Sequence, residues 1–326
     1  MSLPVLASAA EDMIQGRSSG LTREEALLCI HLPLEEMVDL FQIARRVTSV
    51  CTPGTIRTCA LCNAKSGRCS QDCAFCAQSA HHSTQTPIYP LQSVQELVDS
   101  ALAAQDAGAS SFSMVTSGEW LSPQELESIA KAVVKIKERT DLMVCGSLGM
   151  LTPSMAQALV QSGLDRFHHN LETARSYFPQ VCTTHTYDQD IQTLESARDA
   201  GLEICCGGIL GLGESWEQRV ELAFTLRDLD VQAIPLNFLN PIPGTGMADR
   251  PLVQPLRALQ CIALFRLINP TKEIIICGGR EVTLGDFQSW IFMAGASGLM
   301  LGNYLTTQGR SASRDLEMIR EQGLMC

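Results

Sequence analysis

The chain has 326 residues, a formal net charge of −11 and a pI near 5.0, with 45% hydrophobic but only 5% aromatic residues. It contains no Lys/Arg block, so the sequence predicts no nucleic acid and no anionic membrane surface among its partners. No apolar run approaches the ~18 residues of a membrane span, and residues 1–10 lack a signal-peptide pattern. We therefore expect a cytoplasmic protein.

The first 55 residues are predicted to be helical. Apolar residues recur at helical spacing in residues 10–14, 22–30 and 34–47. Thr22 and Glu25 have the spacing of a capping box, which marks the start of the second of these helices. We interpret residues 1–55 as an N-terminal helical cap on the structural unit that follows, residues 56–326.

From residue 56 onward, short apolar runs alternate with amphipathic helical segments. The predicted strands are residues 58–62, 111–116, 143–147, 166–169, 203–207, 233–236, 273–277 and 298–301. The predicted helices between them are residues 94–106, 123–138, 153–161, 188–198, 216–229, 255–268 and 284–294. Eight strands alternating with helices predict an α/β fold, a closed (β/α)8 barrel of the TIM type.

Three cysteines, Cys69, Cys73 and Cys76, lie within eight residues in the spacing C-x3-C-x2-C. Thiolates select soft metals, and three of them can hold a four-iron cluster while leaving one iron open to another ligand. Zinc is the alternative, because Cys59 and Cys62 form a C-x2-C pair, as do Cys73 and Cys76. The separation of the two pairs is short for zinc and leaves Cys69 over, so the spacing favours an iron–sulfur cluster.

The carboxyl ends of the predicted strands carry thiols and polar groups, and in TIM-type barrels these ends hold the active site. Apolar strands that end in such groups are hard to explain by packing alone. The residues collected in this way are Cys59, Cys62, Ser113, Thr116, Cys145, residues 168–172, Cys205, Cys206, Asn237 and Arg280.

Several motifs resemble, in the same order, those of the biotin synthase family in the radical S-adenosylmethionine (SAM) superfamily. Besides the three-cysteine loop, with Phe75 just before its last cysteine, they are NAKSG at 63–67, AQS at 77–79, HNLE at 169–172, GGILGLGE at 207–214 and GGRE at 278–281. The resemblance covers the chain from about residue 59 to its end. It implies a sulfurtransferase that inserts sulfur between two unactivated carbons of dethiobiotin.

The resemblance also implies the cofactors and partners. They are a [4Fe-4S] cluster, SAM, an auxiliary iron–sulfur cluster of the [2Fe-2S] type or larger, a flavodoxin- or ferredoxin-type electron donor, and a second copy of the chain in a homodimer. Reductive cleavage of SAM would give a 5′-deoxyadenosyl radical that abstracts hydrogen from carbon, a reaction that needs a cofactor. The resulting carbon radical would take its sulfur from the auxiliary cluster.

Residue by residue, the resemblance assigns Cys69, Cys73 and Cys76 to the SAM cluster, and Cys145, Cys205 and Arg280 to the auxiliary cluster. It places SAM and its cluster beside Phe75, Asn170, Glu172, Gly207, Gly208 and Glu214. Dethiobiotin would contact His168, Asn170 and Asn237, and His168 stands where the family has an asparagine.

Two further positions depart from the family pattern. Ser113 replaces a cysteine ligand of the auxiliary cluster, and a hydroxyl is a poor ligand for such a cluster. We hypothesise that Cys59 takes its place in a rearranged cluster, for which four irons is one composition. A regular strand would send Cys62 to the opposite face and Cys206 away from Cys205, whereas a bend at the loop would bring both Cys59 and Cys62 in. Asp190 stands where an arginine is expected to pair with the SAM carboxylate, which reverses the charge.

Two other functions remain as alternatives. The chain could be another radical SAM enzyme on the same barrel, a maturase or a carbon-skeleton mutase, which Ser113 and Asp190 favour. Cys145, Cys205, Arg280 and Asn237 argue against this, because such enzymes need no sulfur donor in the barrel. A non-catalytic iron–sulfur or zinc protein is the second alternative, and it leaves the glycine-rich segment 207–214 without a purpose.

Overall fold

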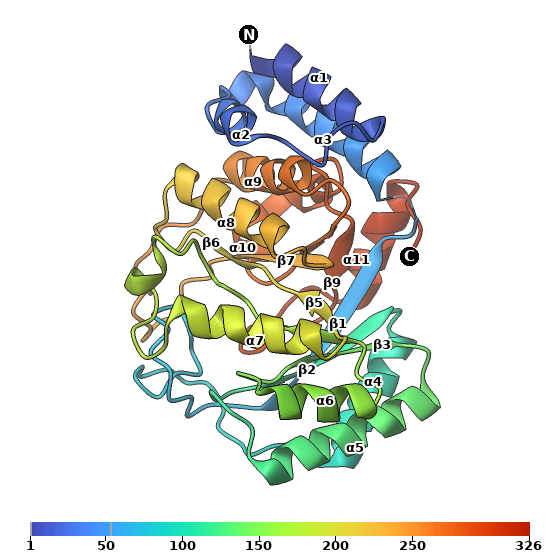
Figure 1. Cartoon of the computed structure of the whole chain (residues 1–326), viewed down its shortest axis with the longest axis vertical. Helices are drawn as coiled ribbons and strands as arrows, with labels where there is room; N and C mark the ends of the chain where they lie inside the picture. Colours follow the sequence, from blue (N-terminus) through green and yellow to red (C-terminus); the bar gives the residue numbers. More distant parts are fainter. Residues whose placement is uncertain (1, 53) are drawn as a thin grey trace.

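The computed structural model describes residues 2–52 and 54–326, and in it a ring of parallel strands is surrounded by helices (Figure 1). Each strand of the ring is short. The strands are β1 (Arg57–Lys65), β2 (Ser111–Thr116), β3 (Met143–Ser147), β4 (Arg166–His168), β5 (Glu203–Cys205), β6 (Gly208–Leu210), β7 (Ala233–Phe238), β8 (Glu273–Ile276) and β9 (Gly298–Met300). Their order is β5-β4-β3-β2-β1-β9-β8-β7-β6, and pairing of β5 with β7 closes the ring. The predicted (β/α)8 barrel is confirmed.

The predicted strand 203–207 is wrong in one respect, because the structure ends it at Cys205, as β5, and a separate strand β6 that was not predicted follows from Gly208. Gly207 lies at the break, where a Cβ atom would overlap the carbonyl oxygen of Pro235. A Cβ atom on Gly208 would lie 2.5 Å from the carbonyl oxygen of Glu172. Glycine is therefore required at both positions so that three backbone segments can approach closely. Together β5 and β6 fill one of the eight strand positions of the barrel.

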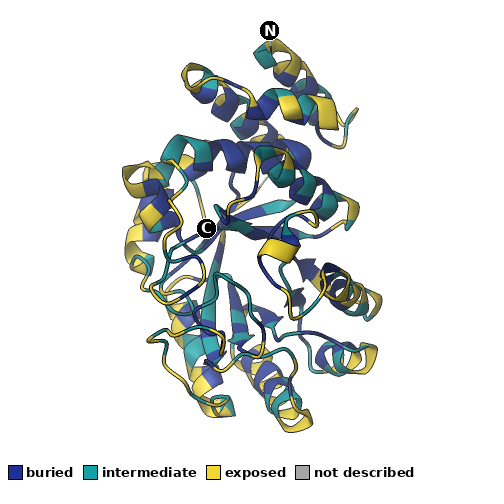
Figure 2. Ribbon diagram, turned by 90° about the vertical axis from the view of Figure 1, so that its left-hand side faces the viewer, coloured by how far each residue is buried: buried dark blue, intermediate teal, exposed yellow. Residues whose placement is uncertain are grey.

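Helices cover the outside of the barrel, and their outer faces are exposed while the strands are buried (Figure 2). Most lie within one residue of the predicted bounds. They are α4 (Val94–Asp106), α5 (Pro123–Arg139), α6 (Pro153–Gln161), α7 (Tyr187–Asp199), α8 (Trp216–Asp228) and α9 (Pro255–Ile268). A capping box starts α4, α5, α7 and α8, at Ser93, Ser122, Thr186 and Ser215.

The C-terminal part of the barrel differs from the sequence prediction. The helix expected over residues 284–294 is replaced by a short helix α10 (Arg280–Leu284) and a 3-10 helix η3 (Gly285–Ile291). Gly285 has a φ of +50°, which ends the α-helix. Two helical elements were not predicted, η2 (Phe178–Gln180) and α11 (Ala312–Glu321).

The N-terminal helices lie together at one end of the molecule, against α9 (Figure 1). They are α1 (Ser2–Ile14), α2 (Arg23–Ile30), the 3-10 helix η1 (Leu34–Glu36) and α3 (Met37–Cys51), and the predicted capping box of Thr22 and Glu25 is present. Helix α9 is buried from Ala258 to Ile268 between this cap and the barrel. The boundary at residue 55 remains an interpretation, and residues 1 and 53 lie outside the described part.

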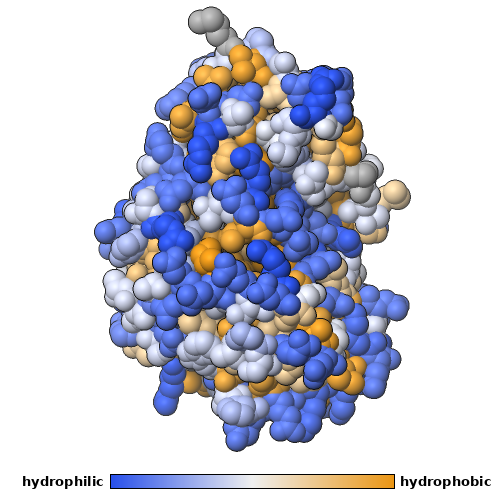
Figure 3. Space-filling model, in the orientation of Figure 1, coloured by the Kyte–Doolittle hydropathy of each residue, from blue (hydrophilic) through white to orange (hydrophobic). Residues whose placement is uncertain are grey.

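The face shown in Figure 3 is mostly hydrophilic, with apolar side chains in scattered groups. Single exposed apolar residues are normal on a protein surface. In the described part of the chain, none of the helices combines the length and the apolar character that crossing a membrane would require.

Candidate active site

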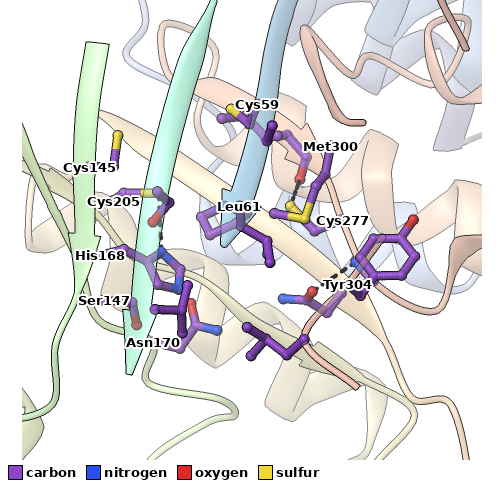
Figure 4. Close-up of a pocket in the computed structure, with 18 of the residues that line it drawn as sticks. Cys59, Leu61, Cys145, Ser147, His168, Asn170, Cys205, Cys277, Met300 and Tyr304 are labelled. Carbon is purple, nitrogen blue, oxygen red and sulfur yellow. Dashed lines mark hydrogen bonds between the residues drawn. The ribbon is translucent and has the colours of Figure 1, made fainter. Parts of the chain in front are cut away.

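A cavity of about 300 Å³ lies inside the barrel, and four cysteine thiols line it (Figure 4). They are Cys59 on β1, Cys145 on β3, Cys205 on β5 and Cys277 directly after β8. The cavity also reaches Phe75 of the three-cysteine loop, together with Asn170, Glu172 and Asn237. The same space therefore connects the four thiols with the loop predicted to hold the first cluster.

Strand register brings polar partners to these thiols. Ser111 lies opposite Cys59, and its hydroxyl donates a hydrogen bond to the Cys59 sulfur at 2.9 Å. His168 lies opposite Cys205, with Nδ1 3.3 Å from the sulfur. Ser113 lies opposite Cys145 and also lines the cavity, at the position where the resemblance leads us to expect a cysteine.

Burial raises the pKa of all four thiols, Cys59, Cys145, Cys205 and Cys277. Without a metal they are therefore protonated and poor nucleophiles. Binding to iron would require each of them to release a proton.

Cys62 and Cys206 point away from the cavity. The Cys62 sulfur lies 3.4 Å from Oε1 of Gln92, in the loop before α4. Cys206 is fully buried but does not line the cavity. Alternation along the strands thus places Cys59 inward and Cys62 outward, and likewise Cys205 inward and Cys206 outward, as predicted.

Arg280 corrects one expectation from the sequence, because its side chain does not line the cavity. The fully buried guanidinium donates to Asp315 Oδ2 at 2.5 Å, to Gln288 Oε1 at 2.6 Å and to Tyr304 Oη at 3.1 Å. These contacts hold α10 to α11 and engage all three guanidinium nitrogens. Cys277, three residues earlier, faces the cavity instead; its position as the last residue of a predicted strand was the signal for it.

The three-cysteine loop is held in place by residues 181–185, a contact that no sequence motif indicated. The Asp72 carboxylate accepts hydrogen bonds from the backbone N–H groups of Thr183 at 2.9 Å and Thr184 at 3.2 Å. Oε1 of Gln71 lies 2.7 Å from Nδ1 of His185. Partial burial opposes ionisation, but the Thr183 bonds lower the pKa of Asp72 below its usual range.

Cys182 belongs to the same segment. It is nearly buried beside Cys73, and its sulfur lies 3.2 Å from both Asp72 Oδ1 and His185 Nδ1. A hydrogen bond that the Cys73 thiol donates to Cys182, and then burial, raise the pKa of Cys73. A fourth thiol therefore lies next to the predicted ligands of the SAM cluster.

Asn170 and Glu172 follow the carboxyl end of β4. The Asn170 amide accepts from Gly207 N at 3.1 Å and donates to Glu172 Oε2 at 3.2 Å. Burial, and then the nearby Asp190, raise the pKa of Glu172 to about 8. Burial, and then His169, lower the pKa of His168 to about 4, so its imidazole is neutral near pH 7.

Asn237 and Glu214 differ in their relation to the cavity. Asn237 lines it, while its amide donates to Gly208 O at 3.3 Å and accepts from Gly278 N at 3.0 Å. Glu214 turns back under the glycine-rich segment and accepts from Gly211 N at 2.8 Å and Arg219 Nε at 2.7 Å. Glu214, Gly207 and Gly208 therefore shape the loop and do not line the cavity.

Asp190 is buried between two histidines. Its Oδ1 accepts from Nε2 of His169 at 2.7 Å, and its Oδ2 lies 3.3 Å from Nε2 of His185. Burial opposes ionisation, but these two histidines lower the pKa of Asp190. The negative charge that Asp190 brings in place of an arginine is therefore compensated within the chain, by the imidazoles of His169 and His185.

The cysteine geometry bears on the choice of metal. Among residues 2–52 and 54–326, no group of three or more His, Cys, Asp or Glu side chains is arranged so that it could hold a single metal ion. The four thiols instead surround a cavity, which suits a body larger than one ion. The soft donor set and the space between the donors thus fit an iron–sulfur cluster.

Comparisons with known proteins agree with this chemistry. Residues 64–226 match the model of the Radical SAM superfamily, and residues 235–325 match that of the Biotin and Thiamin Synthesis associated domain. A biotin synthase from Syntrophus aciditrophicus is 53% identical over 95% of this chain and 96% of its own. One from Nitratidesulfovibrio vulgaris (strain Miyazaki F) is 50% identical over 94% of this chain and 86% of its own.

Solved structures share the fold at low sequence identity. Methylornithine synthase has a TM-score of 0.84 at 17% identity, covering 97% of this chain and 96% of its own. A maturase of [FeFe]-hydrogenase from Carboxydothermus hydrogenoformans has a TM-score of 0.80 at 18% identity, covering 98% of this chain and 79% of its own. These identities support the barrel alone, whereas the curated relatives decide the family. The chain belongs to the biotin synthase family of radical SAM enzymes.

Proposed function

We propose that the chain converts dethiobiotin to biotin with sulfur from an auxiliary cluster held by Cys59, Cys145, Cys205 and Cys277. The observation that carries this is the convergence of four thiols, three of them buried, on one cavity that also reaches the three-cysteine loop. Four thiolates suit a four-iron cluster, in which each iron takes one protein ligand. This assignment replaces Arg280 with Cys277 and Ser113 with Cys59.

The first cluster is proposed to be a [4Fe-4S] cluster on Cys69, Cys73 and Cys76, with SAM on its open iron. When bound, SAM and this cluster supply the radical that removes hydrogen from unactivated carbon. Residues 181–185 hold the loop so that Phe75 faces the cavity. Asn170 and Glu172 are placed to bind the polar groups of SAM, since both line the cavity at the end of β4.

The substrate is proposed to lie between the two clusters. Asn237 and the neutral imidazole of His168 offer hydrogen bonds to the polar ring of dethiobiotin, while Leu61, Ile209 and Met300 contribute apolar surface.

The partners and compartment follow from the family and are likewise proposals. A flavodoxin- or ferredoxin-type protein would deliver the electron, and Cys69, Cys73 and Cys76 are only partly buried, so an electron donor can approach. A homodimer and a cytoplasmic location, where thiols stay reduced, complete the proposal.

The test is an anaerobic reaction of the reconstituted, reduced protein with SAM and dethiobiotin, followed by mass spectrometry. Appearance of both 5′-deoxyadenosine and biotin is the expected result. Deoxyadenosine without biotin would contradict the substrate assignment while leaving the radical SAM chemistry intact. The absence of both products from protein with a full complement of iron would contradict the proposed reaction.

A further inference from the structure

One charged side chain lies among the four thiols without a role in the proposed reaction. Arg166 on β4 lines the cavity, pairs in register with Cys145, and has a side chain only 6% exposed. A buried guanidinium must be compensated, because burying an unpaired charge is costly. The residues that pair with Arg166 therefore show where its positive charge is compensated.

The positive charge of Arg166 is compensated by two carboxylates, those of Glu203 at the start of β5 and Glu273 at the start of β8. Its Nε and Nη2 donate to Oε2 of Glu203 at 2.9 and 2.6 Å, and its Nη1 donates to Oε2 of Glu273 at 2.7 Å. Glu273 also pairs with Arg57 at 3.0 Å. The Glu203 side chain is 47% exposed and that of Arg57 48%. Together the side chains of Arg166, Glu203, Glu273 and Arg57 carry no net charge. The guanidinium of Arg166 is the most deeply buried of the four charged groups.

The guanidinium still has unused hydrogen-bond donors. Arginine carries five N–H donors and no acceptor, and the contacts with Glu203 and Glu273 occupy three of the five. Two carboxylates at these distances keep the group protonated, so no lone pair is free to bind iron. Arg166 can therefore act on a cluster through charge and N–H donation, without being an iron ligand.

We infer that Arg166 is a positioning residue that raises the reduction potential of the auxiliary cluster by placing a fixed positive charge beside its thiolate ligands. The inference rests on the proposed function, because it needs a cluster on the four thiols. Net charge and hydrogen bonds to sulfur are among the factors that set the potential of such clusters. A neighbouring cation stabilises the reduced state, which is the more negative one.

The test uses the full chain with Cys69, Cys73 and Cys76 all changed to Ala, so that any reconstituted cluster is the auxiliary one. Iron, sulfide and the midpoint potential are measured anaerobically. Arg166→Gln should lower the potential by at least the equivalent of a tenfold change in the oxidised-to-reduced ratio, about 59 mV for one electron. Arg166→Lys should lie between it and the parent.

Glu203→Gln provides the opposite sign, because it removes a negative charge and keeps the guanidinium. The potential should rise, by less than Arg166→Gln lowers it, since Glu203 is half-exposed. Glu127→Gln on α5, whose exposed carboxylate pairs with Lys131, is the matched control and should leave the potential unchanged. Opposite shifts are not expected if Arg166 merely supports the fold.

The outcomes separate the two proposals. A fully loaded cluster whose potential is the same in parent, Arg166→Gln and Glu203→Gln would overturn the role of Arg166 alone. A folded triple-alanine protein that retains no iron would overturn the auxiliary cluster and the inference with it. If Arg166→Gln fails to fold, the sign of the Glu203→Gln shift still decides.

Discussion

The carboxylate of Asp190 accepts a hydrogen bond from Nε2 of His169 at 2.7 Å, in a buried position where the family resemblance leads us to expect an arginine. The same carboxylate faces His185, whose other ring nitrogen contacts Gln71 of the cluster loop. A continuous path of polar contacts thus joins β4 and α7 to the loop that carries Cys69, Cys73 and Cys76.

Replacing Asp190 with Ala should destabilise the apo protein. The change leaves two buried imidazoles without their acceptor, and breaking a buried charged pair costs about 3–5 kcal/mol. The free energy of unfolding, measured by urea denaturation under reducing conditions, checks this. Asp188→Ala, which breaks an exposed pair with Arg175, is the control and should cost about 1 kcal/mol or less.

Asp190 does not line the cavity. Asp190→Asn keeps the shape of the side chain and should therefore leave the affinity for SAM close to that of the parent. A large loss of affinity in a folded, fully loaded Asp190→Asn protein would indicate that the carboxylate reaches SAM.

The pairing of His185 predicts a pH dependence of stability. Burial opposes protonation, but hydrogen bonds with Asp190 and Cys182 raise the pKa of His185 from 6.5 to about 10. Because the folded-state pKa is the higher one, this stabilisation is fully present below pH 6.5 and is lost as the pH rises toward 10. Unfolding measured from pH 6 to 10 should show a decline that is smaller in His185→Gln. Equal slopes for the two proteins would contradict the pairing.

Local sequence patterns predicted much of the fold and part of the site. The capping box of Thr22 and Glu25 and the bounds of α4, α6 and α9 follow from spacing within a few residues. The inward position of Cys59 follows from strand alternation. In each case the physical cause lies within one element, so one stretch of sequence is enough to reveal it.

Contacts between distant segments could not be predicted in this way. Asp72 meets Thr183 across 111 residues of sequence, and Arg166 meets Glu273 across 107. Arg280 follows β8 but begins α10, and its orientation depends on Asp315 of α11, a helix that the sequence pattern did not indicate. The direction of a side chain at a strand end is set by tertiary partners.

Arg280 provides a test that separates stability from cluster binding. Arg280→Gln should destabilise the protein by about 3–5 kcal/mol, because it leaves the carboxylate of Asp315 buried without its main partner. The iron content of the folded fraction should stay at the parental value, since the guanidinium does not line the cavity. Loss of auxiliary iron from well-folded Arg280→Gln protein would restore Arg280 as a ligand.

Cys277 and Cys62 form the sharpest pair of variants for the auxiliary cluster. Both are buried cysteines near strand ends, but only Cys277 lines the cavity. Cys277→Ala should lower auxiliary iron and abolish biotin formation while deoxyadenosine formation persists, because the SAM cluster keeps its three ligands.

Cys59→Ala should behave in the same way, and Cys62→Ala should retain parental iron and activity. Iron and sulfide analysis in the background that lacks Cys69, Cys73 and Cys76 makes the comparison direct. Parental iron in folded Cys277→Ala protein, or equal losses in Cys277→Ala and Cys62→Ala, would contradict the four-thiol assignment.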